Sequence, residues 1–252
     1  MVGPVGTDEQ RREEIAANLR VVRDRIAAAC AKAGRAAEEI TLVAVTKTHP
    51  PSDVEHLAAL GVTDVGENRD QEAAPKAAEV AAAGVAVRWH FVGQLQRNKA
   101  RSVVRYADMV HSVDSVRLAR ALGAAAQQRG TPLAALVQVS LDGEPGRGGA
   151  LPDSADPDLG LEPVLAAVAA EPALALRGLM AVAPLPGSGP LGDDPARAFE
   201  QLARIATRVR QTYPDATVLS AGMSSDVEQA INYGATHVRL GSAVLGNRTA
   251  LL

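Results

Sequence analysis

The sequence predicts an α/β protein built as a single (β/α)8 TIM barrel with an extra N-terminal helix. Eight short apolar segments rich in β-branched residues recur along the chain, and segments of helical length separate them. The 252 residues match the size of one such barrel. No GxGxxG motif follows the first predicted strand, so a doubly wound open sheet lacks its usual support. We expect one domain over residues 1–252, with a flexible N-terminus over 1–7.

The predicted elements alternate along the chain. A long amphipathic helix over 8–34 comes first, because apolar residues recur at helical spacing and Gly34 follows. The expected strands are 41–47, 62–66, 87–93, 108–113, 133–140, 174–180, 217–222 and 236–241. The expected helices between them are 69–83, 96–106, 115–129, 161–170, 195–212 and 225–233.

Turn and cap residues refine this interpretation. Loops rich in Gly and Pro over 142–160 and 184–195 follow the fifth and sixth strands, at the end where a barrel carries its binding face. Helix caps are expected from the pairs Thr7 and Gln10, Ser52 and Glu55, and Ser225 and Glu228, and from Asp114.

Composition excludes several classes of function. A net charge of −3 with mixed signs argues against a nucleic-acid-binding surface, and no apolar run approaches the ~18 residues of a membrane span. Cys30 is the single cysteine, and no signal peptide is visible, so we expect a cytoplasmic protein. His49, Asp53 and His56 have helical spacing, but Pro50 interrupts it, so we predict no metal site.

Lys47 is the first candidate functional residue. Lysine and arginine together number 26, and only four of these are lysines. Alternation along 41–47 points Lys47 to the same interior as Val43 and Val45, at the end of the strand. Burial would lower the pKa of its amine and favour attack on a carbonyl. The alternatives are a lysine that extends into solvent and one that pairs with Glu67.

The last two predicted strands end in phosphate-binding chemistry. The segment 220–225 (SAGMSS) and the segment 239–246 (RLGSAVLG) each offer a glycine turn, hydroxyl groups and the amides of a helix start. The loops after strands 7 and 8 are a frequent phosphate site of this barrel. Either loop alone could be an ordinary turn with a serine cap, but together they predict a phosphate site.

Two further residues have both a functional and a structural interpretation. Arg239 could be a fixed cation near a ligand ring, or an arginine that faces solvent or pairs with a carboxylate. His90 could line the pocket, although a lone histidine is more often a hydrogen-bonded core residue. A reactive lysine with a phosphate site fits either a Schiff-base aldolase for a phosphorylated sugar or a protein that binds pyridoxal 5′-phosphate.

Six segments resemble the pyridoxal phosphate homeostasis proteins, which are single-barrel relatives of the alanine racemase N-terminal domain. They are VAVTKTHP, VGENRDQE, WHFVGQLQRNK, HSVDS, RGLMAVAP and LSAGMSSDVEQAINYGATHVRLGSAVLG, in order from about Ile40 to Gly246. The resemblance implies an aldimine between the cofactor and Lys47, and an arginine, Arg239, facing the pyridine nitrogen. By the same resemblance Asn68 lies beside the cofactor, Ser224, Gly241 and Ser242 hold the phosphate, and Met223 and His90 line the pocket.

The chain departs from the family pattern in places. His49 stands where lysine is frequent, Arg69 where tyrosine is common and Ala221 where methionine is usual. Arg69 would add a cation near the mouth of the site.

The resemblance implies a role in intracellular vitamin B6 balance as a monomer or weak dimer, with pyridoxal phosphate and cofactor-dependent apoenzymes as partners. The alternative is a racemase-like enzyme. Alanine racemase adds a C-terminal β-domain and a tyrosine base, whereas this sequence ends at Leu252, and its three tyrosines fall in or beside predicted helices. We therefore expect binding without established turnover, and no catalytic residue is assigned.

Overall fold

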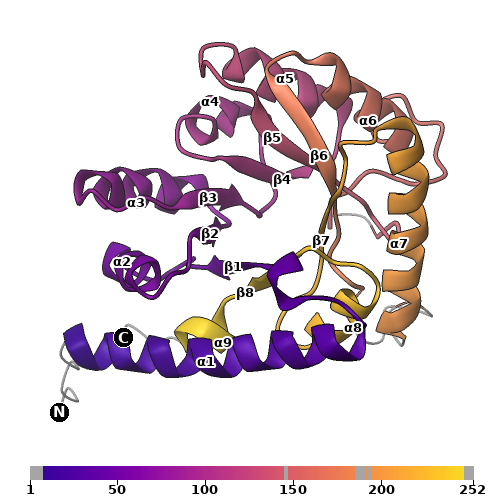
Figure 1. The fold of residues 1–252 in the computed structure, drawn as a ribbon. Helices are drawn as coiled ribbons and strands as arrows, with labels where there is room; N and C mark the ends of the chain where they lie inside the picture. The colour runs from indigo at the N-terminus through magenta and orange to yellow at the C-terminus, as the bar shows by residue number, and fades with distance from the viewer. Residues whose placement is uncertain (1–7, 145–146, 185–190, 192–193, 247–252) are drawn as a thin grey trace.

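The computed structural model describes residues 8–144, 147–184, 191 and 194–246 and shows the predicted closed barrel (Figure 1). Its eight strands are parallel and pair in sequence order, and β1 pairs with β8 to close the ring. The strands are β1 Thr41–Val45, β2 Asp64–Glu67, β3 Arg88–Phe91, β4 Met109–Val113, β5 Leu133–Gln138, β6 Leu174–Met180, β7 Val218–Ser220 and β8 His237–Leu240.

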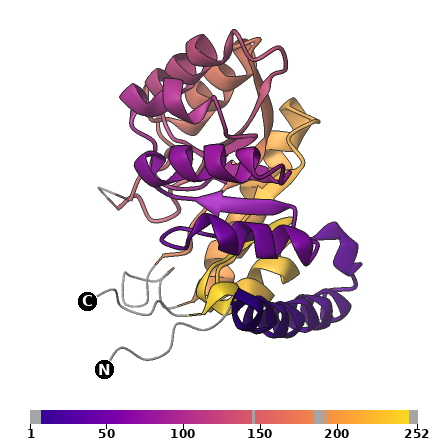
Figure 2. The same cartoon turned by 90° about the vertical axis from the view of Figure 1, so that its left-hand side faces the viewer.

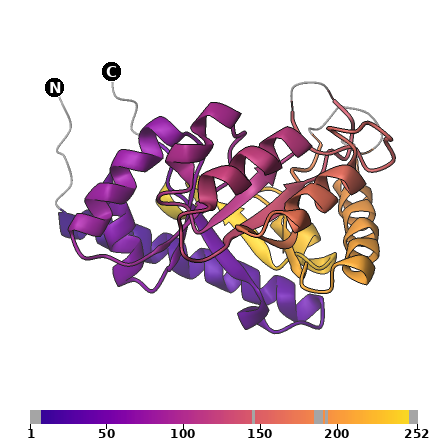
Figure 3. The same cartoon turned by 90° about the horizontal axis from the view of Figure 1, so that it is seen from above.

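Helices surround the strands, as two further views show (Figures 2 and 3). The α-helices are α1 Asp8–Lys32, α2 Pro51–Ala59, α3 Asp70–Ala82, α4 Ala100–Val103, α5 Val116–Ala126, α6 Leu161–Ala170, α7 Pro195–Thr212, α8 Val227–Asn232 and α9 Ser242–Leu245. Two 3-10 turns, η1 Ala37–Glu39 and η2 Arg97–Lys99, complete the described elements. Because aromatic residues make up only 2% of the chain, the layer between strands and helices consists mainly of Ala, Val, Leu and Ile.

The first helix, α1, lies outside the ring, next to helices from the beginning and the end of the chain. Ile15, Leu19, Val22 and Ile26 are buried, as their spacing predicts. The helix packs against α8, α9 and α2, so the start of the chain lies beside its last described elements (Figures 1 and 2). Arg11 of α1 donates a hydrogen bond to the Leu245 carbonyl at 2.9 Å, which stabilises the contact between α1 and α9.

Several predicted boundaries are wrong. The helix expected over 96–106 is a 3-10 turn followed by the four-residue α4, and β1 ends at Val45, two residues before Lys47. The helix α2 begins close to the start expected from Ser52 and Glu55, whereas the short elements η1 and α9 were not among the expected segments. The loops over 142–160 and 184–195 do follow β5 and β6, although 145–146 and most of the second loop lie outside the described residues.

The predicted caps are also wrong where the structure describes them. Pro50 precedes α2, and Asp226 occupies the cap position of α8, in neither case with a side-chain cap bond. Ser115, rather than Asp114, caps α5 by accepting a hydrogen bond from the Leu118 amide. Thr7 of the first predicted pair lies outside the described residues. Serine and acidic residues near a helix start compete for the cap position, and the local turn decides which one occupies it.

The residues of the interrupted histidine pattern pair with α1 instead of gathering around a metal. Asp53 receives two hydrogen bonds from Arg11, at 3.0 and 2.6 Å, and lies 3.1 Å from the His49 ring. His56 pairs with Asp8 at 3.0 Å. Within the described ranges, no cluster of three or more His, Cys, Asp or Glu residues could hold a metal ion, and no helix has the length and apolarity to cross a membrane.

Candidate functional site

The strand register brings the predicted ligand residues together at one sector of the barrel mouth. Val45 lies opposite Gly66 on β2, and Val43 lies opposite Arg239 on β8. One residue further, the Thr46 amide donates to the Gly66 carbonyl at 2.9 Å, so the pairing with β2 ends just before Lys47, and the register with β8 places Gly241 next to Val45 at the end of β1. The Arg239 amide donates to the Gly222 carbonyl at 3.0 Å, which joins the loop after β7 to the same sector. The carboxyl ends of β7, β8, β1 and β2 therefore lie next to one another along one arc of the barrel mouth.

The residue before Lys47 is fixed by a buried polar cluster. Thr46 is fully buried, and its hydroxyl donates to Glu67 Oε1 at 2.7 Å. The Lys76 amine, itself buried, donates to the Thr46 carbonyl at 2.8 Å, to Glu67 at 2.6 Å and to Glu72 at 3.0 Å. These contacts hold the backbone from which Lys47 projects.

The chain turns sharply immediately after Lys47. Thr48 has a φ of 68°, a left-handed conformation that is uncommon for a residue with a branched side chain. Its backbone amide donates a hydrogen bond to the Glu72 carboxylate, which helps to hold the turn. Lys47 therefore lies between two backbone positions that are both fixed by neighbouring side chains.

The structure corrects the expected burial of Lys47. Its side chain is exposed, because β1 ends at Val45 and the alternation of the strand no longer applies at residue 47. Pairing with Glu67, one of the two alternatives, is also wrong, because Glu67 pairs with Lys76. Lys47 is thus an accessible amine on a fixed backbone.

Asn68 and Gly241 give the sector two features that fit a ligand. Asn68 Oδ1 is buried and has no hydrogen-bond partner among the described residues, although buried polar groups almost always have one. A Cβ atom at Gly241 would lie 3.3 Å from the Val45 carbonyl oxygen, so a side chain there would crowd the end of β1. An unpaired acceptor after β2, a glycine after β8 and an exposed amine after β1 suit a ligand that has polar groups and a carbonyl.

The loops after β7 and β8 leave the predicted phosphate residues accessible. Met223 is 38% exposed, and Ser224 and Ser242 are exposed as well. The Met223 amide donates to Asp226 at 2.6 Å, and Arg25 of α1 donates to the Ser224 carbonyl at 2.7 Å. These two contacts hold the backbone of the loop, while its serines remain exposed.

Arg239 lies inside the barrel, and no carboxylate of the described residues lies within hydrogen-bond distance of it. It is 5% exposed, and it donates to Ser220 Oγ at 2.7 Å and to the Ala181 carbonyl at 3.0 Å. Burial lowers the pKa of its guanidinium to about 10, so it remains a cation at neutral pH. The solvent-facing and carboxylate-paired alternatives are both wrong for this residue.

His90 lies deeper in the barrel than the other predicted site residues. It is 3% exposed, its Nδ1 lies 2.8 Å from His111 Nε2, and its Nε2 lies 2.8 Å from Asp64 Oδ1. Both ring nitrogens therefore have protein partners, as in the core-histidine interpretation.

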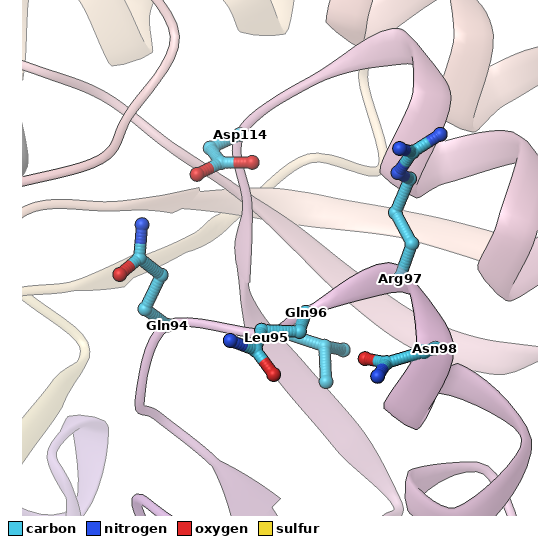
Figure 4. A pocket seen from close by; sticks show the side chains of 6 residues that line it. All are labelled: Gln94, Leu95, Gln96, Arg97, Asn98 and Asp114. Atoms are coloured by element: carbon cyan, nitrogen blue, oxygen red, sulfur yellow. The ribbon is translucent and has the colours of Figure 1, made fainter.

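A separate cavity of about 630 Å³ opens on the carboxyl side of β3 and β4 (Figure 4). In that view the amide of Gln94 and the carboxylate of Asp114 approach each other, and Arg97 lies across the cavity. Burial raises the pKa of Asp114. The cavity contains none of the predicted cofactor residues. It is lined by Gln94, Leu95, Gln96, Arg97, Asn98 and Asp114.

Comparison with known proteins identifies the family. Residues 12–249 match the alanine racemase N-terminal domain. The pyridoxal phosphate homeostasis protein of Mycobacterium bovis is 43% identical over 262 residues, which cover 98% of each chain. The Escherichia coli K12 protein of the same name is 40% identical and covers 93% of this chain and 97% of its own. The chain belongs to the pyridoxal phosphate homeostasis protein family.

Solved structures agree with this family assignment. PipY of Synechococcus elongatus, solved with pyridoxal phosphate bound, is 34% identical, with a TM-score of 0.75 over 92% of this chain and all of its own. Alanine racemase of Corynebacterium glutamicum is 19% identical, with a TM-score of 0.64, over 96% of this chain and 63% of its own. That second likeness shows a shared fold alone.

Sequence reasoning missed the buried polar residues that support the family's site. Lys76 and Glu67 fix Thr46, and Ser220 with His111 holds Arg239 and His90. The signal for Lys76 was available, since it is one of only four lysines and follows Glu72 at helical spacing. Ser220 and His111 stand alone in apolar strands and give no pattern that would link them.

Proposed function

We propose that this chain binds pyridoxal 5′-phosphate at the mouth of β7, β8, β1 and β2 and holds it for intracellular vitamin B6 balance. The observation that carries the proposal is that three neighbouring strands end in an exposed Lys47 amine after β1, an unpaired, buried Asn68 oxygen after β2 and the Gly241 backbone after β8. The relatives named for this role and the cofactor-bound PipY structure support it.

Each residue of the sector has a distinct part in this proposal. The cofactor supplies an aldehyde carbon that condenses with a primary amine, with loss of water. Lys47 offers that amine, while Ser224, Ser242 and the Gly241 backbone receive the phosphate. Asn68 accepts a hydrogen bond from the cofactor, and Met223 covers one side of it.

Arg239 and His90 complete the assignment from inside the barrel. Arg239 donates toward the ring nitrogen, which keeps that nitrogen unprotonated because an arginine cannot readily give up its proton. His90 supports the site indirectly, through its hydrogen bonds inside the barrel, and does not contact the cofactor, because both of its ring nitrogens already have protein partners.

The positions of the tyrosines favour holding over racemisation. Tyr213 and Tyr233 follow the carboxyl ends of α7 and α8, and Tyr106 lies between α4 and β4. Helices of this barrel run against the strands, so all three lie toward the end of the ring away from Lys47. Two-base racemisation needs a second base opposite the lysine, and these tyrosines are far from that position. We place the role in the cytoplasm, and cofactor-dependent apoenzymes are the proposed recipients of released cofactor.

The test uses the four lysines of the chain. Purified protein is loaded with pyridoxal phosphate, its visible spectrum is recorded, and the adduct is reduced with borohydride and mapped by mass spectrometry. The modified peptide should contain Lys47, and Lys47→Ala should lose the visible band while Lys32→Ala keeps it. A band that persists in Lys47→Ala would overturn the lysine assignment. A wild-type protein without any band would overturn cofactor binding itself.

Two further measurements separate the functional alternatives. Accumulation of D-alanine from L-alanine by the loaded protein would favour the racemase-like alternative. Transfer is tested by mixing loaded protein with a cofactor-free enzyme that requires pyridoxal phosphate. Recovery of that enzyme's activity at the rate of cofactor release supports the holding role, and no recovery at all contradicts it.

A further inference from the structure

A continuous chain of hydrogen bonds crosses the barrel interior beneath the proposed site. It begins at Arg239, whose guanidinium donates to Ser220 Oγ at 2.7 Å. Ser220 Oγ lies 2.9 Å from His111 Nδ1, and His111 Nε2 lies 2.8 Å from His90 Nδ1. His90 Nε2 then lies 2.8 Å from Asp64 Oδ1, which ends the chain. We call these five residues, Arg239, Ser220, His111, His90 and Asp64, the core chain.

The core chain runs from the ligand end of the barrel to the opposite end. Arg239 bonds to the carbonyl of Ala181, which directly follows β6, so its guanidinium reaches the carboxyl ends of the strands. Asp64 is the first residue of β2 and therefore lies at their amino ends. All five side chains are at least nine-tenths buried, and they come from β2, β3, β4, β7 and β8.

The positions of the protons in the core chain follow from its two ends. An arginine can only donate, so Ser220 accepts from Arg239 and donates its own hydrogen to His111 Nδ1. His111 then carries its proton on Nε2 and donates to His90 Nδ1, and His90 carries its proton on Nε2 and donates to Asp64. Every bond is satisfied with both rings neutral, and every donor points toward Asp64.

The electrostatics of the interior agree with this arrangement. Burial holds the pKa of His111 well below its ordinary value, which keeps this ring neutral. Burial alone would raise the pKa of Asp64, but hydrogen bonds from His90, Arg88 and Thr63 hold it well below its ordinary value. A buried cation and a buried anion are thus connected through Ser220 and two histidine rings rather than by direct contact.

We propose that the core chain is a one-way relay in which Asp64, His90, His111 and Ser220 position Arg239 and set the proton affinity of the ligand bound in front of it. The proposal rests on the cofactor site proposed above. Asp64 polarises each hydrogen bond in turn, which makes Ser220 Oγ a better acceptor for Arg239. The ligand at the mouth then responds to a carboxylate at the far end of the barrel.

Other charged groups also face this region and must be held constant in a test. Burial lowers the pKa of His237 to about 4, and its ring centroid lies 6.1 Å from that of His90. Arg88 donates to Asp64 at 2.7 Å, but its own side chain is 64% exposed. Asp226, which follows β7, acts on Arg239 from the loop above it.

The first test needs no cofactor. Nitrogen-15 NMR of the histidine rings in the cofactor-free protein should show His90 and His111 both neutral, with hydrogen on Nε2 and an unprotonated Nδ1. A hydrogen on Nδ1 of either ring would reverse one link and overturn the relay. Because this result does not depend on the ligand, it stands or falls separately from the proposed function.

The second test measures the pH midpoint of the visible band in the loaded protein. Asp64→Asn should lower that midpoint by about one pH unit, because loss of a negative charge disfavours proton uptake at the ligand. The matched control is Asp108→Asn, which removes an exposed carboxylate that precedes β4 and bonds to the Trp89 amide. The control should leave the midpoint unchanged.

A double-variant cycle separates a relay from a simple long-range charge effect. Ser220→Ala interrupts the core chain without changing its charge. In a Ser220→Ala background, Asp64→Asn should shift the midpoint by less than half as much as in the wild type. An equal shift in both backgrounds, or no shift with Asp64→Asn in a protein that shows the band, would overturn the relay and leave the proposed function standing. If Asp64→Asn fails to fold, the histidine NMR of the wild type decides.

Discussion

Replacing Lys76 with methionine should destabilise the protein strongly, because it leaves a buried carboxylate without its partner. Glu67 is 0% exposed, and its Oε2 already lacks a hydrogen bond among the described residues. The Lys76 amine supplies the 2.6 Å ion pair to Glu67 and also bonds to the Thr46 carbonyl and to Glu72. Removing one partner of such a pair costs about 3–5 kcal/mol. Protonation of Glu67 can relieve part of this loss, so we expect about 3 kcal/mol near neutral pH.

The pH dependence of this variant has a definite sign. Burial raises the pKa of Glu67 even with Lys76 present, and without that amine the pKa should rise further. A carboxyl whose pKa is higher in the folded state contributes stability below its unfolded pKa, and loses it as pH rises through the folded pKa. The Lys76→Met protein should therefore be closer to wild type at about pH 5 than at about pH 8.

Urea unfolding followed by far-UV circular dichroism measures this effect in the cofactor-free protein. The matched control is Lys32→Met, because Lys32 is exposed in the last turn of α1. An exposed charge of this kind contributes only about 0–1 kcal/mol. Adding Glu67→Gln to Lys76→Met should recover at least half of the lost stability. A Lys76→Met protein no less stable than Lys32→Met would refute the reasoning.

Three other substitutions test the packing and the acid stability. Gly178→Ala should lose at least about 2 kcal/mol of stability in urea unfolding. Gly178 has a φ of 149°, and a Cβ atom there would lie 1.9 Å from the Val218 carbonyl oxygen. A urea midpoint equal to that of the wild type would contradict this clash. Asp53→Asn should make the free energy of unfolding depend less on pH below about pH 4. Burial opposes ionisation of Asp53, but hydrogen bonds from His49 and Arg11 lower its pKa to about 2, so the wild type loses about 2 kcal/mol of stability as pH falls from about 4 through 2. The same pH dependence in Asp53→Asn as in the wild type would show that Asp53 is not responsible. Leu122→Ala, at a fully buried position of α5, should cost about 2–5 kcal/mol by thermal or urea unfolding, whereas less than 1 kcal/mol would show that the site collapses around the smaller residue.

The fold could be predicted from the sequence because its pattern repeats eight times. Each strand is a short β-branched run, and errors in one boundary do not alter the alternation as a whole. Features that depend on a few atoms were predicted less well. The strand β1 stops at Val45, and this two-residue difference moves Lys47 from the expected interior to the surface. Cap positions failed for the same reason, since neighbouring polar residues compete for them.

The strand ends that carry the proposed site could be predicted, because a barrel must bring the carboxyl ends of its strands to one face. Lys47, Asn68 and Gly241 each lie within two residues of the end of β1, β2 or β8, and these three strands are neighbours in the sheet. The interior beneath them could not be predicted. Ser220 and His111 are more than one hundred positions apart, and only the three-dimensional register makes them partners.

The pairing of β1 with β8 also sets the order in which the molecule can be completed. The contact between Arg11 and Leu245 joins positions 234 residues apart, and α1 packs on α8 and α9. Contacts of such separation form late, because the entropy of closing the intervening loop must be overcome first. During synthesis, a ribosome-bound chain that lacks β8 has Lys47 but neither Gly241 nor Arg239. The proposed cofactor site is therefore assembled only after the last strand of the barrel has been made.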